Sequence, residues 1–434
     1  MSVYSFKEVI EEQKQPLDYK IEKAVEAVSE AFKLSKGAVG LAFSGGKDST
    51  VLWHLVKTYF PDAQYHVIFG NTTVEFPESL AFARKLGREW SSDEVQFHEV
   101  LPERLEEDGL KYEAQKEVLE WLIKEGRVKE VLKEDGKLKS TRTLENAATQ
   151  EMWEDFWKRG LVWKKGTMKS FVWCCDQYGY PILGKAASKL TARRINIDCF
   201  LRFSKSESDK EETLEYYDLI QNVKTSNHCC SILKKEPSEK KQAELGIDVV
   251  MKGLMAEESH SRLLSFATRG YVFKSSRPHA SEFYHVSPIG IWRDEDIWEY
   301  IHRFNVPYSP LYDIEYTNTK GKCCCIKRNG CVGCCTDIAF KDNHMSVLRQ
   351  THPKLWEHYM KSGLGDELMK LYRYKGNGRV NYLSVARNIS DAIDMRPCAF
   401  DDLGERIVSD VITSSKYDSE IDGQMSLFDL GIEL

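Results

Sequence analysis

Short apolar runs alternate with amphipathic stretches along the first hundred residues of the chain. Apolar side chains are concentrated at 39–43, 65–69 and 95–100, and the stretches between them carry apolar residues at helical spacing. Strands and helices that alternate in this way predict an α/β fold built on a doubly wound parallel sheet. A further apolar run at 248–251 predicts another strand, which follows after a long interval.

The first predicted strand leads into a glycine-rich turn, residues 44–49 (S-G-G-K-D-S), which opens a predicted helix. Glycines in such a turn let backbone N–H groups approach an anion, and a helix N-terminus adds unpaired donors and a favourable dipole. Hydroxyl groups and a lysine add further donors and a positive charge. The candidate phosphate-binding residues are Ser44, Gly45, Gly46, Lys47 and Ser49.

Asp48 narrows the chemistry of this turn. A carboxylate beside a phosphate is useful mainly when a Mg²⁺ ion lies between them. A Walker A loop is excluded, because the register set by Lys47 would place Leu41 at its first glycine and Asp48 at its Ser/Thr position. The pattern G-x-G-x-x-G is absent from the turn. The alternative is an ordinary strand–helix turn that contains two glycines.

Changes of pattern divide the rest of the chain into segments. Residues 102–165 are rich in Glu and Lys with apolar residues at helical spacing, which predicts a helical insertion or lid. The expected segments are N-terminal helices (1–36), a nucleotide-binding α/β core in two parts (37–101 and 171–315), the insertion (102–170), a cysteine-rich segment (316–340), a helical C-terminal region (341–408) and a polar tail (409–434).

Twelve cysteines, most of them clustered, indicate metal or redox chemistry. The chain has no secretion signal and no apolar run long enough to span a membrane, so we expect a cytoplasmic protein whose thiols stay reduced. The net charge of −6 gives no global attraction to nucleic acid, and any such binding must use a local basic patch.

Six stretches, in this order, resemble the phosphoadenosine phosphosulfate (PAPS) reductase family of the PP-loop ATP pyrophosphatase superfamily. The resemblance covers roughly residues 38–338 and implies an adenine nucleotide alpha-hydrolase-like fold. The matching stretches are the loop 43–49, the turn 71–78, C-C-x-x-x-K-x-x-P from Cys229, the loop 253–262 ending in E-S-x-x-R, the segment from Pro288 to Asp313, and G-C-x-x-C at 330–334.

Two departures distinguish the chain from true sulfonucleotide reductases. Sulfonucleotide reductases carry a basic loop before the E/Q-S motif, and they carry a nucleophilic cysteine in a C-terminal tail. Here Glu257 and Glu258 occupy that loop, and no cysteine follows Cys398. The pattern around Cys331, Cys334 and Cys335 looks more like the ATP pyrophosphatases of bacterial DNA phosphorothioation.

That resemblance implies ATP cleavage to AMP and pyrophosphate, which activates an acceptor oxygen for sulfur. Lys47 and Asp48 are then catalytic with Mg²⁺, and Asn71, Thr72 and Gly253 bind the nucleotide. Arg262 is the candidate for holding the acceptor phosphate, and the weaker candidates are Lys185, Lys189 and Lys234. A PAPS or adenosine phosphosulfate reductase, a tRNA thiolase with the same loop, and a non-catalytic nucleotide-binding module remain as alternatives.

The resemblance also implies a [4Fe–4S] cluster, for which Cys331 and Cys334 are a ligand pair in every interpretation. Cys229 and Cys230 supply the other two ligands in the preferred one. The alternative draws on Cys323, Cys324 and Cys325 instead. Zn²⁺ is a less favoured metal for the same thiolates. A metal-free group of buried cysteines is the remaining alternative, and the number of cysteines argues against it.

The predicted partners follow from the same resemblance. They are DNA as the ultimate substrate, a cysteine desulfurase and other sulfur-modification proteins. Residues Gln424 to Phe428 (Q-M-S-L-F) resemble the peptide with which bacterial proteins dock on the DNA sliding clamp. A helix or strand that packs on the body of the protein is the alternative for this peptide.

Overall fold

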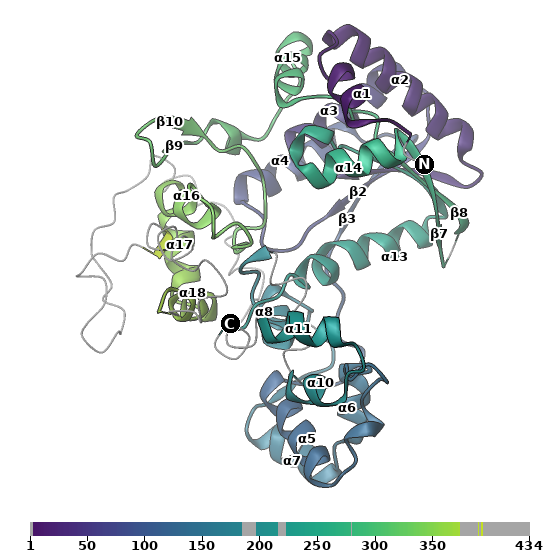
Figure 1. Ribbon diagram of the computed structural model, residues 1–434. Coiled ribbons are helices and arrows are strands. Elements are labelled where there is room, and N and C mark those ends of the chain that lie inside the picture. The colour runs from purple at the N-terminus through teal and green to yellow at the C-terminus, as the bar shows by residue number, and fades with distance from the viewer. Residues whose placement is uncertain are drawn as a thin grey trace.

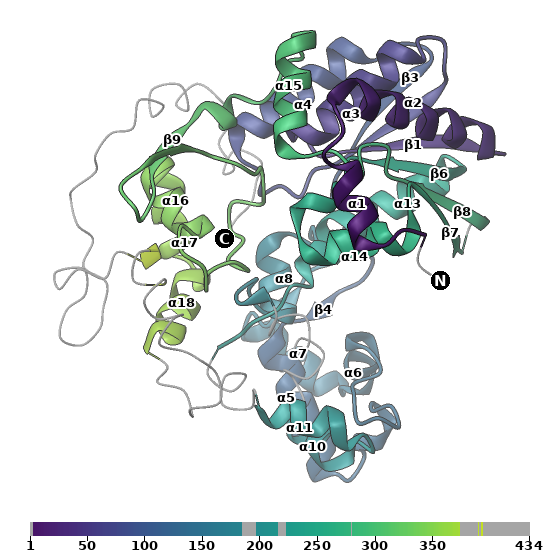
Figure 2. The same cartoon turned by 45° about the horizontal axis from the view of Figure 1, so that its top comes forward.

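The computed structural model describes residues 3–184, 197–215, 223–278 and 280–373, together with 389, 392 and 393. Figures 1 and 2 show three bodies: an α/β core, a lobe around α5 to α7, and a helical body around α16 to α18. Lys185, Lys189, Cys398 and the peptide 424–428 lie outside the described residues, as does the whole predicted tail.

A six-stranded sheet with the order β3-β2-β1-β6-β8-β7 forms the core. Neighbouring strands run parallel except for β7 and β8, which are antiparallel. The mostly parallel sheet confirms the predicted fold class, and it brings the carboxyl ends of β1, β2 and β6 to one rim. The strands are β1 (Ala38–Phe43), β2 (Tyr65–Gly70), β3 (Val95–Val100), β6 (Ile247–Lys252), β7 (Val272–Arg277) and β8 (Ala280–Val286).

Helices cover both faces of this sheet because its apolar residues alternate between them. Leu41 and Phe43 of β1 belong to the large core under α2 and α3, whereas Ala38 and Ala42 pack in a smaller cluster on the other face. There α13 contacts β2 and β6. The helices of this body are α1 (Phe6–Glu12), α2 (Leu17–Leu34), α3 (Lys47–Tyr59), α4 (Pro77–Trp90), α13 (Glu236–Glu244), α14 (His260–Arg269) and α15 (Asp294–Phe304).

The structure contains two strands, β7 and β8, that the sequence pattern does not predict. Polar residues such as Lys274, Ser275 and Arg277 interrupt β7, which is the partly exposed edge strand of the sheet. An edge strand of this kind lacks the apolar run by which the central strands are found. The structure also corrects the start of α15, where Asp294 is an expected N-cap: Arg293 is the N-cap, and Asp296 accepts its backbone N–H at 2.6 Å.

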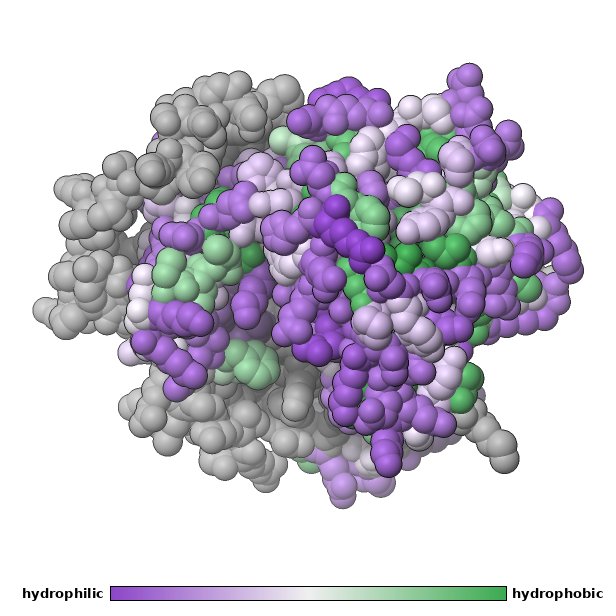
Figure 3. All heavy atoms as spheres, turned by 90° about the horizontal axis from the view of Figure 1, so that it is seen from above, coloured by the Kyte–Doolittle hydropathy of each residue, from purple (hydrophilic) through white to green (hydrophobic). Residues whose placement is uncertain are grey.

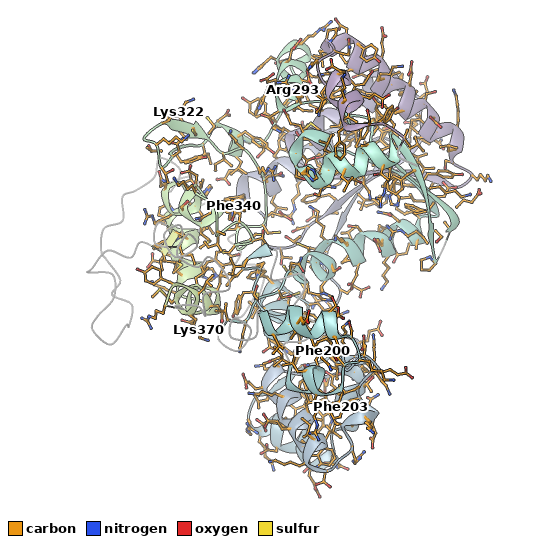
Figure 4. All side chains as sticks on the ribbon, in the orientation of Figure 1. Phe200, Phe203, Arg293, Lys322, Phe340 and Lys370 are labelled. Carbon is orange, nitrogen blue, oxygen red and sulfur yellow. The ribbon has the colours of Figure 1, made fainter. Side chains whose placement is uncertain are left out.

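Residues 109–163 form a lobe with its own hydrophobic core. Leu110, Val118, Leu122 and Phe156 are all buried in it. Figure 4 places the labelled Phe200 and Phe203 on this lobe, where Phe203 packs against its core. The elements are β4 (Gly109–Leu110), α5 (Tyr112–Lys124), η1 (Val128–Glu130), α6 (Thr141–Ala147), α7 (Gln150–Lys158) and β5 (Val162–Trp163), followed by α10 (Ile197–Phe203) and α11 (Glu207–Glu215).

A second large core, here called the cysteine-side core, joins the middle of the chain to its helical C-terminal region. It contains Cys174, Cys175, Cys229 and Cys335 together with apolar residues of α16 to α18. Phe340, which is labelled in Figure 4, lies outside it and is 67% exposed. The elements are α8 (Phe171–Tyr178), η3 (Ser231–Lys235), η4 (Ala256–Glu258), η5 (Pro310–Asp313), β9 (Glu315–Thr317), β10 (Cys323–Cys325), α16 (His344–Thr351), α17 (Pro353–Met360) and α18 (Gly363–Arg373).

In the part of the chain that the structure describes, no helix is both long and apolar enough to cross a membrane. Figure 3 shows that hydrophilic residues cover most of the described surface seen from above.

Candidate functional site

The glycine-rich turn lies at the rim of the sheet, between β1 and α3. Gly45 has a φ of +71°, a left-handed conformation that favours glycine, and Gly46 is the N-cap of α3. The Ser44 and Ser49 hydroxyls lie 3.0 Å apart, and Ser49 Oγ also donates to the Gly46 carbonyl at 3.0 Å. The loop therefore has the strand–turn–helix geometry of an anion site.

Lys47 is buried at the start of α3 between two carboxylates. Its Nζ lies 2.6 Å from Asp48 Oδ1 and 2.8 Å from Asp294 Oδ1. Burial opposes the charge on Lys47, but the two aspartates outweigh it and raise the pKa of the ammonium group. Burial also raises the pKa of Asp48, and the nearby charges of Glu258 and Asp294 act in the same direction against the attraction of Lys47. Two carboxylates thus hold one buried ammonium group, and the charge of a third, Glu258, acts on Asp48.

Two residues from distant segments close over the loop. The Lys47 backbone N–H donates to Tyr312 Oη at 3.1 Å, and Asn329 Nδ2 donates to the Ser44 carbonyl at 2.9 Å. A Cβ on Gly46 would lie 2.5 Å from Asn329 Oδ1, so only glycine leaves room for this contact. The loop is therefore tied to the cysteine-rich segment that carries Asn329.

Sequence reasoning misses Asp294, Tyr312 and Asn329 as members of the site. No short-range pattern marks them, because each reaches the loop only through the fold. The signal that comes nearest is the position of Asp294 and Tyr312 within the late motif segment from Pro288 to Asp313.

The turn after β2 holds Asn71 and Thr72 on the same rim. Asn71 Nδ2 donates to Glu99 Oε1 at 2.6 Å, and its side-chain oxygen accepts the backbone N–H of Thr73. Thr72 Oγ1 donates to Glu75 Oε1 at 2.8 Å and lies 3.5 Å from Cys331 Sγ. The predicted nucleotide-binding turn is thus in direct contact with a predicted metal ligand.

Gly253 and Arg262 follow β6 at the neighbouring position of the rim. A Cβ on Gly253 would come within 3.1 Å of the Asp48 backbone, so this glycine allows the close approach of the two loops. Arg262 is half-exposed on α14, and its Nε lies 4.0 Å from Glu258 Oε2. Because Glu258 also acts on Asp48, Arg262 is linked to the glycine loop through that carboxylate.

Cys229 and Cys230 form an unequal pair at the start of η3. The Cys229 thiol donates a hydrogen bond to Cys230, and this bond, helped by Lys235 and Lys234, lowers the pKa of Cys230 to about 6. The same hydrogen bond and burial raise the pKa of Cys229. The lowered pKa favours the thiolate form of Cys230, which is the form that binds metal.

Cys331 and Cys334 lie on one tight turn, in which the Cys334 N–H donates to the Cys331 carbonyl at 3.1 Å. Burial raises the pKa of both thiols, and the charge of Cys230 is close enough to raise that of Cys334 further. Cys323 to Cys325, the alternative ligands, lie on β10 of a separate hairpin, where Cys323 and Cys325 are exposed.

The donor chemistry of Cys229, Cys230, Cys331 and Cys334 fits a thiolate-ligated centre, since all four carry sulfur donors and the pKa of Cys230 is lowered. The side chains do not converge, however. Among the described residues no three His, Cys, Asp or Glu side chains form a group that could hold a metal ion. Instead Cys331 faces the Thr72 hydroxyl and Cys334 faces that of Thr336, at 3.3 Å.

The model of the phosphoadenosine phosphosulfate reductase domain matches residues 38–151 and 160–335. This chain belongs to the PAPS reductase family. The matched ranges include the glycine loop, the turn after β2, Gly253, Arg262 and the four predicted cysteine ligands. Proteins of this family are enzymes, and the fold described above is the nucleotide-binding α/β fold that the sequence predicts.

Curated members of the family match only part of the chain. An adenosine 5′-phosphosulfate reductase from Lysinibacillus sphaericus is 34% identical over 91 residues, or 21% of this chain and 35% of that protein. One from Staphylococcus epidermidis is 25% identical over 162 residues, 37% of this chain and 56% of the relative. A phosphoadenosine 5′-phosphosulfate reductase from Xylella fastidiosa is 29% identical over 98 residues, 23% of this chain and 38% of its own length. The chain therefore spans from 35% to 56% of the length of these relatives.

Solved structures are similar at a low level. A PAPS reductase from Candida auris in a phosphate complex gives a TM-score of 0.31 at 11% identity, covering 68% of this chain and 89% of that one. A U34-tRNA thiolase from Methanococcus maripaludis with its [4Fe–4S] cluster gives 0.26 at 10% identity, covering 90% and 86%. Scores this low carry no argument about function.

Proposed function

We propose that this member of the PAPS reductase family is an ATP pyrophosphatase that cleaves ATP to AMP and pyrophosphate and so activates an acceptor oxygen for sulfur. One observation carries the proposal: the buried Lys47 lies between Asp48 and Asp294 at the mouth of a glycine loop. A cation and the N-terminus of α3 at this point suit a pyrophosphate leaving group, on which negative charge grows during the reaction.

The residues of the loop have separate tasks in this mechanism. The N–H groups at the start of α3 and the Ser44 and Ser49 hydroxyls bind the pyrophosphate oxygens. Lys47 balances their charge, and Asn71 and Thr72 bind the adenosine side of the nucleotide. Asp48 and Asp294 would hold Mg²⁺, which supplies charge stabilisation between the phosphates when it is bound.

Arg262 would hold the phosphate of the acceptor, with Lys234 as a weaker candidate. The acceptor oxygen attacks the α-phosphate, pyrophosphate leaves, and the adenylated oxygen is later displaced by sulfur, with AMP as the leaving group. We propose DNA as the acceptor and a cysteine desulfurase as the partner that supplies sulfur. Cys229, Cys230, Cys331 and Cys334 would hold a [4Fe–4S] cluster, which supplies a site for sulfur or electron chemistry when it is bound.

The decisive experiment compares nuclease digests of DNA and of tRNA from cells with and without this gene. We expect phosphorothioate dinucleotides in DNA only when the wild-type gene is present, and none with Lys47→Gln. Lys57→Gln, an exposed lysine on the same helix, is the matched control and should leave the product unchanged. Thiolated nucleosides in tRNA without any DNA product would instead identify a tRNA thiolase.

Sulfonucleotide reduction is the second candidate, because the curated relatives named above are adenosine or phosphoadenosine phosphosulfate reductases. The loop after β6 argues against it. Glu257 accepts the backbone N–H of Asp294 at 2.6 Å and contacts Arg293, so its negative charge is fixed beside the site where a sulfate would bind. Sulfite release from adenosine phosphosulfate with thioredoxin as the reductant would establish this second function.

A further inference from the structure

A cavity lined by basic side chains lies beside the glycine loop, between α14 and the carboxyl ends of β6 and β8. It has a volume of about 170 Å³. Four basic side chains line it, and none of its lining residues in the described part of the chain carries a carboxylate. The four are Lys252, Arg262, Arg269 and His285.

The charges in this cavity are poorly compensated. Among the described residues, neither Lys252 nor Arg269 has a carboxylate within ion-pair distance, and Arg262 reaches Glu258 only at 4.0 Å. Burial and the charges of Arg277 and Arg262 lower the pKa of Lys252 to about 8. Basic side chains gathered around one cavity without carboxylates repel one another, so the arrangement favours an anion that is held there.

His285 supplies an independent sign of a missing ligand. Its side chain is only 6% exposed and stacks on Phe273, and its Nε2 lies 3.0 Å from Ser275 Oγ. Its other ring nitrogen, Nδ1, is buried and has no hydrogen-bond partner among the described residues. A buried polar atom is rarely left unpaired in a folded protein, and this one belongs to a residue that lines the cavity.

We propose that this cavity binds a phosphate group, held by Lys252, Arg269 and His285. Arginine offers paired N–H donors to the oxygens of a phosphate, and the Ser265 and Ser287 hydroxyls in the lining add neutral donors. Burial, together with the charges of Lys252, Arg277 and Arg269, lowers the pKa of His285. A bound anion would offset those charges, and Nδ1 would then take up a proton.

The position of the cavity indicates which molecule the bound phosphate group belongs to. Lys252 adjoins Gly253, which contacts the backbone of Asp48, and Arg262 is linked to Asp48 through Glu258. A phosphate in the cavity therefore lies next to the glycine loop but outside it. We assign the cavity to a phosphate of the nucleic-acid acceptor. This choice of ligand, unlike the phosphate site itself, rests on the proposed function.

The test follows the imidazole of His285 by NMR of protein labelled at histidine, with the resonance assigned by its loss in His285→Gln. Inorganic phosphate should shift this resonance and raise the pH at which the imidazole titrates. Lys252→Met and Arg269→Gln should weaken the response at least about tenfold, as loss of a charged hydrogen bond predicts. Arg127→Gln, on the separate lobe, is the control with an unchanged response. Circular dichroism of each variant checks that it folds.

A short single-stranded oligodeoxynucleotide forms the second arm. A shift of the same resonance by the oligonucleotide supports the acceptor role, and a shift by inorganic phosphate alone overturns that role. No shift with either ligand, or an equal response in Arg269→Gln, overturns the phosphate site itself. Pyrophosphate release from ATP is measured on the same samples, so loss of the cavity and loss of the proposed function are separate results.

Discussion

The chemistry of the site depends most on the carboxylates that pair with the charge of one buried lysine, Lys47. Lys47 is 4% exposed and contacts Asp48 and Asp294 at once, so its ammonium group is held by two carboxylates before any nucleotide binds. Phosphates that enter the loop bring negative charge to a point where the carboxylates already hold the ammonium group in place. The lysine is therefore pre-positioned for the leaving group.

Replacing Lys47 by Gln should lower the rate of pyrophosphate release by about 10²- to 10³-fold, the usual cost of losing one pre-positioned group that stabilises developing charge. The measurement is kcat for pyrophosphate release with Mg²⁺ and saturating ATP. Lys57→Gln, on the exposed side of the same helix, should stay within about twofold of wild type. A wild-type rate in Lys47→Gln would remove this lysine from the mechanism.

The second prediction for a single residue concerns Asn329, which contacts the glycine loop. Its side chain fixes the Ser44 carbonyl and packs on Gly46, so Asn329→Ala should loosen the loop and raise KM for ATP more than it lowers kcat. Loss of one neutral hydrogen bond of about 1 kcal/mol corresponds to a roughly fivefold change. Steady-state kinetics separate the two constants, and Asn318→Ala in the β9–β10 hairpin provides the control. A fall in kcat alone would contradict a positioning role.

Sequence reasoning finds the residues of this site that sit in one continuous motif and misses those that come from elsewhere. Ser44 to Ser49 are readable because strand, turn and helix succeed each other within a few residues. Asp294, Tyr312 and Asn329 reach the loop from segments about 250 residues or more away, and only the folded chain brings them together. Asp294 is the first residue of α15 and not its N-cap, and its side chain contacts Lys47 instead.

At the scale of elements, the strength of local patterns decides what can be predicted. The central strands β1, β2, β3 and β6 are apolar runs, and each appears in the structure within a residue or two of its expected bounds. The edge strand β7 escapes prediction because its outer positions are polar. The helical nature of the insertion is visible in the sequence, but its independent core is a property of packing.

That core gives a prediction about stability. Phe156 is 1% exposed within the lobe, so Phe156→Ala should destabilise the lobe by about 3–5 kcal/mol, the cost of a large cavity. Trp157, its neighbour, is 41% exposed, and Trp157→Ala should cost less than about 1 kcal/mol. Hydrogen exchange resolved by segment measures both. Equal loss of protection in the sheet and in the lobe would show that the lobe does not unfold as a separate unit.

Over the whole molecule, the cysteine-side core joins the cysteine-rich segment to the rim of the sheet that carries the glycine loop. Thr72 contacts Cys331, and Glu75 pairs with Cys331 through a backbone bridge. Asn329, two residues before Cys331, fixes the glycine loop. A centre held by these cysteines would therefore be mechanically connected to the nucleotide site through two short contacts.

The choice among the cysteines is testable on protein purified without oxygen. Cys331→Ser and Cys334→Ser should lose most of the bound iron and acid-labile sulfide, whereas Cys323→Ser and Cys325→Ser on the exposed hairpin should keep it. Cys230→Ser should behave like the first two variants. Iron loss in the Cys323 or Cys325 variant would transfer the ligand role to the hairpin, and stoichiometric zinc in place of iron would refute the cluster.

The most direct test of the account is the identity of the products formed from ATP. Purified protein is incubated with ATP, Mg²⁺ and DNA, and the nucleotides and phosphates are separated by ion-exchange chromatography. An ATP pyrophosphatase forms AMP and pyrophosphate in equal amounts. We expect Lys47→Gln to lower the formation of both by about 10²- to 10³-fold. Formation of ADP and inorganic phosphate, or of AMP and pyrophosphate at the same rate in Lys47→Gln, would contradict the proposed function.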